Sequence, residues 1–150
     1  MSRQYDHYAL TEPSRWYAHS VDTRDFSKLP QIFAPDARLI VATPEPEAPP
    51  IFRFEGLAQL SAALQTITRY PKTFHMLGQH LVLEYSGDTA RTETYCRALH
   101  FYPRNGIQYE YIMYIRYLDT LRKKTDEAWE FTERYLVVDA ESGVALMPEL

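Results

Sequence analysis

Two histidines stand at matching places on either side of a tight turn and could carry out acid–base chemistry together. Residues 73–85 are rich in Leu, Val, Phe and Tyr, which suits a half-buried strand. Gly87 lies in the turn that follows, and residues 89–102 run back as a second strand. Counting back from the turn places His75 and His100 at the same end of this hairpin. Histidine ordinarily has a pKa of about 6.5, so it can accept or donate a proton near neutral pH.

The second strand presents a row of small side chains that ends in a histidine. Because strand side chains alternate between faces, one face carries every second residue. This face consists of Ala90, Thr92, Thr94, Cys96, Ala98 and His100. Small residues leave room above a sheet, and we expect either a ligand or a closely packed helix to fill it. If a ligand does, Cys96 and Ala98 contact it.

The next strand, residues 107–121, is apolar on both faces, and each face needs cover. Tyr111 and Met113 lie on one face with other large side chains, whereas Tyr114 lies on the opposite face. One face can line a pocket, and the other then faces a second subunit. We predict that the ligand contacts also include Tyr111, Met113, Trp16 and Trp129.

Composition limits the class of protein. A chain of 150 residues with 45% hydrophobic and 24% charged residues is typical of one soluble globular domain. We predict a single domain over residues 1–150 with its core at about 11–139 and terminal extensions at 1–10 and 140–150. The net charge of −4, with scattered basic residues, argues against a nucleic-acid partner.

Other features concern the compartment and metal binding. No apolar run approaches the roughly 20 residues that span a bilayer, and the first residues lack the apolar core of a signal peptide. The single cysteine, Cys96, excludes an intramolecular disulfide. We therefore expect a cytoplasmic protein without a membrane partner. The histidines show no zinc-binding spacing, so we expect no metal.

The order of predicted elements indicates an α+β fold. Helices are expected first, then two strands, a third helix and four antiparallel strands. The ranges are helices 11–23, 25–33 and 56–70, and strands 37–43, 51–54, 73–85, 89–102, 107–121 and 128–139. Thr11 is the expected cap of the first helix. Helices packed on one face of a curved antiparallel sheet make an α+β architecture.

Four phrases of the sequence carry a resemblance to a known family. They are WYAHSVDTRDFSKLPQIFAPDARL, FEGLAQL, FHMLGQHLVLEYSGDTARTETYCRALH and EAWEFTERYLVV. Their order and spacing resemble the SnoaL-like branch of the nuclear transport factor 2-like superfamily. The resemblance implies a cone-shaped curved sheet around a pocket that the helices close. It also implies a homodimer or homotrimer formed through the open face of the sheet.

The resemblance further implies roles for four residues. Scytalone dehydratase and hexachlorocyclohexane dehydrochlorinase of this superfamily are similar at the positions of Asp22 and His75, and scytalone dehydratase is also similar at that of His100. Bile-acid dehydratases of this fold are similar at the position of Tyr17. In this interpretation His75 is the base, Asp22 orients it, His100 binds the leaving hydroxyl or shares the proton, and Tyr17 donates a hydrogen bond. No organic cofactor is implied. Val21 stands where scytalone dehydratase has a tyrosine, which argues against scytalone as the substrate.

Three functional hypotheses follow. The first is a cofactor-independent, dehydratase-like lyase for a small, apolar, cyclic molecule of polyketide or steroid type. The second is an isomerase or polyketide cyclase that uses the same base. The third is a non-catalytic binding protein or partner subunit, like the small subunit of ring-hydroxylating dioxygenases.

Each candidate residue also has a purely structural interpretation. Asp22 could cap a helix, and Tyr17 could be a core residue. Arg134 is either structural or a contact for an acidic substrate, and alternation places it on the face opposite Phe131. His80 has the opposite parity to His75 and is expected on the other face of its strand.

Overall fold

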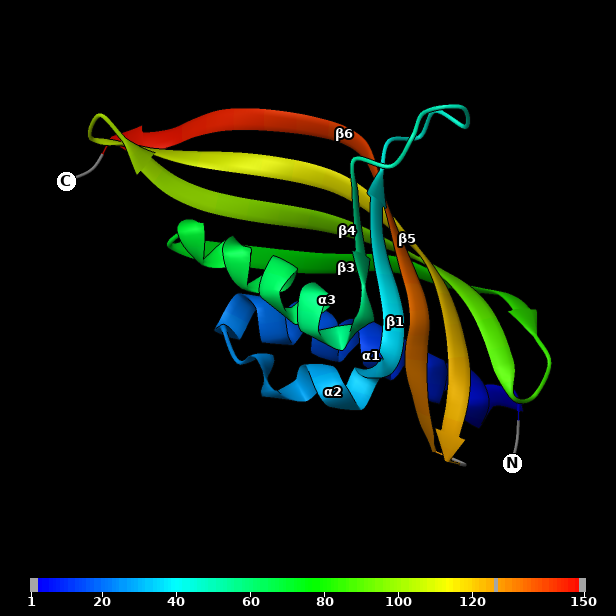
Figure 1. Cartoon of the computed structure of the whole chain (residues 1–150). Coiled ribbons are helices and arrows are strands. Elements are labelled where there is room, and N and C mark those ends of the chain that lie inside the picture. The colour runs from blue at the N-terminus through cyan, green and yellow to red at the C-terminus, as the bar shows by residue number, and fades with distance from the viewer. Residues whose placement is uncertain (1–2, 126, 149–150) are drawn as a thin grey trace.

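Three helices lie against the concave face of a curved six-stranded sheet (Figure 1). The computed structural model describes residues 3–125 and 127–148. The helices are α1 (Arg3–Thr23), α2 (Leu29–Ile32) and α3 (Gly56–Gln65), with single 3-10 turns at Phe26–Lys28 and Thr66–Arg69. The strands are β1 (Phe33–Ala42), β2 (Phe52–Glu55), β3 (Lys72–Tyr85), β4 (Thr89–Arg104), β5 (Ile107–Thr125) and β6 (Ala128–Pro148).

The sheet is mostly antiparallel. Its strand order is β2-β1-β6-β5-β4-β3, and only β1 and β6 run parallel as neighbours within the described residues. All three helices lie on one side, where the sheet curls around them (Figure 1). The α+β fold class and the predicted order of elements are confirmed.

The first helix is longer than predicted. Thr11 does not cap it, because α1 spans Arg3–Thr23 and includes Pro13. Proline lacks a backbone N–H and so leaves a carbonyl of the preceding turn without its helical partner. Pro13 is fully buried, and the packing of α1 on β3 and β6 offsets this loss.

The last strand is also longer than predicted. The segment 140–148, expected as a loose extension, continues β6 to Pro148 and pairs with β5 as far as Ile107. Strand pairing uses main-chain groups and does not require an apolar sequence. The ladder therefore extends beyond the alternating apolar pattern that ends near Asp139.

A bulge in β3 overturns the prediction for His80. Leu77 pairs with Cys96, but the next pair along is His80 with Thr94. Three steps on β3 therefore match two on β4, which inverts the alternation of faces. His80 Nδ1 lies 2.8 Å from Thr94 Oγ1, on the inner face of the sheet.

A second bulge brings Arg134 to the inner face. Thr120 pairs with Glu133, and Leu121 pairs with Phe131, so Thr132 is an extra residue in β6. The prediction that Arg134 lies opposite Phe131 is therefore wrong. The Arg134 guanidinium carbon is 4.4 Å from the centroid of the Phe131 ring.

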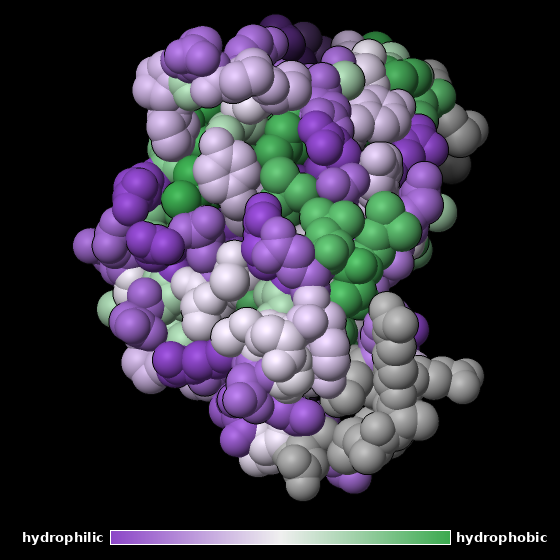
Figure 2. All heavy atoms as spheres, turned by 90° about the vertical axis from the view of Figure 1, so that its right-hand side faces the viewer, coloured by the Kyte–Doolittle hydropathy of each residue, from purple (hydrophilic) through white to green (hydrophobic). Residues whose placement is uncertain are grey.

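The convex face of the sheet is apolar and open in the single chain. Large side chains of β3, β4 and β5 are exposed there, among them Phe74, Met76, Leu81, Tyr95 and Tyr114. A space-filling view from the side shows hydrophobic residues gathered into a patch within a mostly polar surface (Figure 2). Exposed apolar area of this kind is typical of a surface that another molecule covers.

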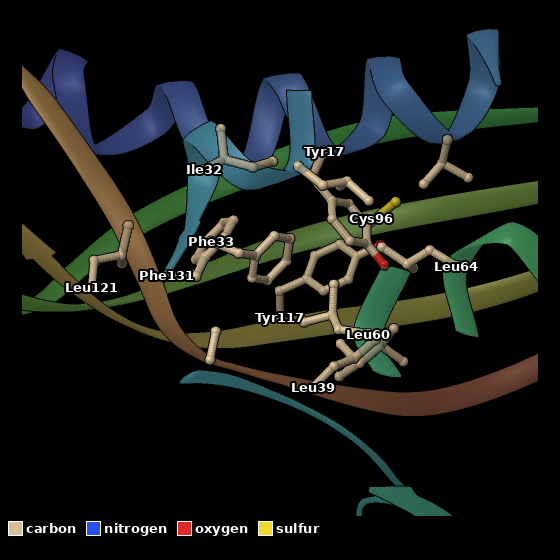
Figure 3. Packing of buried hydrophobic residues seen from close by; sticks show 14 of the residues in the cluster. Tyr17, Ile32, Phe33, Leu39, Leu60, Leu64, Cys96, Tyr117, Leu121 and Phe131 are labelled. Carbon is tan, nitrogen blue, oxygen red and sulfur yellow. The ribbon is translucent and has the colours of Figure 1, made fainter. Parts of the chain in front are cut away.

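The core between α1 and the sheet is built from aromatic rings (Figure 3). Tyr17 of α1 meets Tyr117 of β5 edge to face, with ring centroids 5.7 Å apart. Phe33 and Phe131 lie 4.9 Å apart by the same measure. Leu60 and Leu64 are the residues of α3 that are buried in this cluster, as its apolar spacing predicts.

A buried ion pair lies among these rings. Arg134 donates two hydrogen bonds of 2.9 Å to Asp119, and it donates a third, of 2.7 Å, to Ser14 of α1. Both charged side chains are fully buried, and the guanidinium lies 3.8 Å from the centroid of Tyr117. Burial alone would lower the pKa of Arg134, but the Asp119 carboxylate raises it above its ordinary value. Arg134 thus holds α1 to the sheet.

We predict that Arg134→Met destabilises the protein by about 3–5 kcal/mol, because it leaves the Asp119 carboxylate buried without its partner. Urea unfolding measures this loss. The double variant Arg134→Met/Asp119→Leu should regain most of it, since no uncompensated charge remains. The control is Arg116→Met at the partly exposed Arg116–Asp139 pair, which should cost at most about 1 kcal/mol. An Arg134→Met loss no larger than that of this control would contradict the prediction.

Candidate active site

A cavity of about 430 Å³ lies between the helices and the concave face of the sheet. Its walls are mainly apolar, with contributions from Val21, Leu39, Leu64, Ile67 and Ile115. Polar or ionisable side chains also line it, among them Tyr17, Arg69, His75 and His100. Mostly apolar cavities with a few convergent polar groups are the usual form of a small-molecule site.

The structure places Asp22 against His75. Asp22 lies in the last turn of α1 and His75 near the start of β3. The His75 Nδ1 atom is 2.7 Å from Asp22 Oδ1, and the His75 backbone N–H donates to Oδ2 at 2.7 Å. Thr73 adds a third hydrogen bond, of 3.0 Å, from its hydroxyl to Oδ1. Because a carboxylate accepts the Nδ1 proton, Nε2 of His75 is left as the free basic atom.

The charge state of Asp22 suits a residue that orients the His75 ring. Burial would raise the pKa of its carboxyl, but the hydrogen bonds from His75 and Thr73 lower it below its ordinary value. Asp22 is therefore ionised at neutral pH. Only 6% of the His75 side chain is exposed, so Asp22 and not water is the polar partner of its Nδ1 atom.

Arg24 supports the contact between Asp22 and His75, a role that was not predicted from the sequence. Its backbone φ of 63° is in the left-handed region, which ends α1 sharply. Its guanidinium donates to the Val21 carbonyl, the Thr73 hydroxyl and the Tyr70 carbonyl at 2.8, 3.1 and 2.9 Å. Arg24 thus ties the end of α1 to the start of β3. The sequence shows only a charged residue after a helix, which is no signal for such a role.

His100 is buried and neutral. The register pairs it with Thr73 and pairs His75 with Ala98, so the two histidines lie two residues out of register on the same face. Their ring centroids are 6.1 Å apart. Burial lowers the pKa of His100 to about 4, although its hydrogen bond to the Tyr111 carbonyl opposes this effect. Because Nδ1 donates that bond over 3.2 Å, Nε2 is an acceptor.

Tyr17 lies at the floor of the cavity as a neutral phenol. Its side chain is almost completely buried beside Tyr117 and above Arg134. Burial raises its pKa to about 12, even though the Arg134 charge acts in the opposite direction. The hydroxyl of Tyr17 can therefore donate a hydrogen bond at any physiological pH, and it cannot serve as a base.

The predicted ligand contacts divide into two groups. Ala98 and Met113 line the cavity, and Tyr111 lines its mouth. Cys96 is buried beside Tyr117, where burial raises its thiol pKa to about 11, and it does not line this cavity.

The two tryptophans are wrongly predicted as cavity residues. Trp16 is 38% exposed, because it is one position out of phase with the inward-facing Tyr17 on α1, and Lys28 covers its ring. Trp129 is buried against Tyr85 at the other end of the sheet.

The mouth forms a second compartment of about 420 Å³. It shares Val41, Phe52, Ile67, Arg69, His100 and Met113 with the inner cavity. Tyr70, Tyr111 and Glu141 lie only in the outer part. The two compartments therefore adjoin, and His100 lies at their boundary.

Two further observations concern metals and membranes. In residues 3–125 and 127–148, no three His, Cys, Asp or Glu side chains are grouped so that they could hold a metal ion. No helix in the same ranges has the length and apolar character to cross a bilayer.

The SnoaL-like domain family matches residues 6–135, so the chain belongs to this family. None of the curated proteins matches the chain by sequence.

Solved structures share the fold at low identity. A candidate scytalone dehydratase from Novosphingobium aromaticivorans is 20% identical with a TM-score of 0.75, covering 96% of this chain and 91% of its own. The hexachlorocyclohexane dehydrochlorinase LinA-type3 from Novosphingobium barchaimii is 15% identical with a TM-score of 0.78, covering 99% and 96%. The beta subunit of a candidate aromatic-ring-hydroxylating dioxygenase from N. aromaticivorans is 15% identical with a TM-score of 0.75, covering 91% of both chains. At these identities the likeness establishes the fold alone.

The depressed pKa of His100 predicts a loss of stability in acid. Below pH 6.5 the unfolded chain binds a proton at this position, while the folded chain does not until about pH 4. The free energy of unfolding should therefore fall between pH 6.5 and 4, by at most about 3 kcal/mol from this group. His100→Asn keeps an N–H donor for Tyr111 but cannot titrate, so it should flatten this part of the curve.

Urea unfolding at a series of pH values provides the measurement. Burial likewise lowers the pKa of His80 to about 4, so some of the slope should remain in His100→Asn. The exposed His19 serves as control, and His19→Asn should retain the slope of the wild type. Equal slopes in His100→Asn and the wild type would refute the proposed neutral state of His100.

Proposed function

We propose that this protein is a cofactor-independent lyase that eliminates water from a small, largely apolar, cyclic molecule. The observation that carries the proposal is the Asp22–His75 pair, with His75 among the residues that line a mainly apolar cavity. A histidine oriented by an ionised carboxylate is a general base suited to neutral pH. The apolar walls and the size of the cavity support a small, largely apolar substrate.

The first step is abstraction of a proton. His75 Nε2 takes a proton from the carbon next to a carbonyl, and the electron pair of the C–H bond moves toward the carbonyl oxygen. Asp22 stabilises the imidazolium that forms. The Tyr17 hydroxyl donates a hydrogen bond to the oxygen, on which negative charge grows.

The second step is departure of the hydroxyl group. The electron pair returns from the oxygen to form the C=C bond, and the bond to the β-hydroxyl breaks. Since burial keeps His100 neutral, His100 cannot supply the proton for this departure. His75 returns the proton that it took, and water leaves. His100 Nε2 accepts a hydrogen bond from the departing hydroxyl. Because His75 both takes and returns the proton, the proton and the hydroxyl must leave from the same face of the substrate.

An isomerase or cyclase would share the first step but not the second. The same base and donor serve enolisation, and the reaction would then end with a proton returned to another carbon or with ring closure. A non-catalytic partner subunit, by contrast, gains nothing from a buried histidine that a carboxylate orients toward a cavity. The pair therefore favours catalysis over a binding role.

Proton exchange tests the first step without knowledge of the natural substrate. We expect the protein to catalyse exchange of the α-hydrogens of bicyclic β-hydroxyketones into D₂O, followed by loss of water, as measured by NMR. His75→Ala should reduce exchange by about 10²–10⁴-fold, which is the usual contribution of a general base. Asp22→Asn should also reduce it, because the imidazolium loses its partner.

His19→Ala removes an exposed histidine from α1 and should leave exchange unchanged. Thermal unfolding of each variant shows whether it is folded. Full exchange by a folded His75→Ala variant would remove His75 from the mechanism, and exchange without loss of water would favour the isomerase.

We also propose that the open convex face joins copies of the chain in a homodimer or homotrimer. The support is the exposed apolar row of Phe74, Met76 and Leu81 on β3, next to Tyr95 and Tyr114. A single copy would leave this area in water.

Sedimentation equilibrium measures the assembly. The wild type should have two or three times the chain mass of 17.6 kDa. Met76→Glu places a charge on the apolar face and should shift the mass toward the monomer, whereas Arg53→Glu on β2 should not. A wild-type monomer at micromolar concentration would exclude this assembly.

A further inference from the structure

The mouth of the cavity contains a pair that the proposed reaction does not use. The Tyr111 hydroxyl, on β5, donates a hydrogen bond to Glu141 Oε1, on β6. The Tyr111 ring lies near-parallel to Tyr70, with centroids 6.4 Å apart, and 5.3 Å from the His100 ring by the same measure. The pair thus lies in the outer compartment, beside the His100 ring that lines both compartments.

The pair presents acceptors to whatever enters. The single proton of the Tyr111 hydroxyl is used by Glu141, so the phenol oxygen can only accept further hydrogen bonds. Burial and the Glu141 carboxylate raise the pKa of Tyr111 well above its ordinary value, which keeps this proton in place. Glu141 is exposed at the mouth, and its second oxygen is a further acceptor. A hydrogen-bond donor on a ligand is the natural complement.

The charges at the mouth favour a neutral hydrogen-bond donor over an anionic or a cationic group. An anion would meet the carboxylates of Glu45 and Glu141, whereas Asp139 is already bound by Arg116 in two hydrogen bonds of 2.6 and 2.9 Å. A cation would compete with Arg69, whose guanidinium carbon is 5.1 Å from the centroid of the Tyr70 ring. That place over an aromatic face is where a ligand ammonium would bind. A neutral hydroxyl faces neither obstacle.

We propose that Tyr111 and Glu141 recognise a hydroxyl group at the end of the substrate remote from the reacting carbon. The inference deepens the proposed function, because it names the polar end of the molecule whose apolar end reaches His75. The two compartments share six lining residues and adjoin, and in this proposal one elongated molecule occupies both. The substrate is then amphipathic, with a hydroxyl at the mouth and an apolar ring inside.

Binding of a biphenyl series tests this proposal by calorimetry. The probes are 4-phenylphenol, its methyl ether 4-methoxybiphenyl, 4-phenylbenzoate and 4-phenylbenzylammonium. A hydrogen bond to a charged group contributes about 1.5–3 kcal/mol, so 4-phenylphenol should bind at least about tenfold more tightly than the ether. It should also bind more tightly than either ion.

Variants separate recognition from size. Tyr111→Phe keeps the ring but loses the acceptor, and Glu141→Gln removes the charge. In both, the preference for 4-phenylphenol over the ether should fall to about threefold or less. Glu110→Gln is the matched control, because Glu110 lies next to Tyr111 on the opposite face of β5, and it should keep the full preference.

Three results would overturn the proposal: equal binding of phenol and ether by the wild type, a preference that persists in both variants, or tightest binding of the ammonium probe. None of these measurements needs turnover. If the protein fails the exchange assay but prefers 4-phenylphenol to the ether, the proposed lyase activity is wrong and this hydroxyl site stands. If the protein catalyses exchange but shows no such preference, the lyase proposal stands and this site is wrong.

Discussion

The carboxylate of Asp22 is the interaction on which the candidate site depends. It accepts hydrogen bonds from the backbone and ring of His75 and from the hydroxyl of Thr73. All three donors belong to the first residues of β3, an edge strand of the sheet, whereas Asp22 belongs to α1. The same contacts therefore close the helix onto the sheet and select the tautomer of His75. Arg24 reinforces the junction through Thr73 and the Tyr70 carbonyl.

The fully buried Arg134–Asp119 ion pair has a different purpose. Arg134 is enclosed by Asp119, Ser14 and aromatic rings, and none of its atoms reaches solvent. Burial of an ion pair rarely adds net stability, although loss of one partner is costly. Arg134 thus fixes the position of α1 and the electrostatic surroundings of Tyr17 without contact with the cavity. The protein thus separates a polar centre that sets geometry from one that lies at the cavity.

The sequence predicted the elements well because each has a local signal. A composition rich in Leu, Val, Phe and Tyr predicted β3, the helical spacing of Leu60 and Leu64 is typical of α3, and Gly87 marked the turn between β3 and β4. The inward row from Ala90 to His100 is also correct, since β4 keeps a regular register with β5 along its length. Alternation failed where a bulge intervenes, as it does before His80 and at Thr132. A bulge depends on pairing with another strand, and one strand's residues do not reveal it.

The site was predictable only in part, for related reasons. Tyr17, Asp22, His75 and His100 came from residue type and family resemblance, and the structure gathers them at one cavity or its support. Trp16 and Trp129 were predicted as ligand contacts, but a large aromatic residue type does not show whether its side chain points into the cavity. Arg24 depends on a left-handed backbone, and Glu141 depends on an extension of β6 that main-chain pairing creates. Such residues acquire roles from tertiary structure, and the sequence alone carries no pattern for them.

The position of Asp22 itself argues against a purely structural role. It lies in the last turn of α1, where the helix dipole disfavours a negative charge by about 0.3–1 kcal/mol. A residue chosen only to end this helix would be neutral or basic. Burial adds a further cost to the charged form, which hydrogen bonds from β3 must offset. A carboxylate that is costly at its own helix end but meets the ring of His75 at 2.7 Å is best explained by the histidine that it orients.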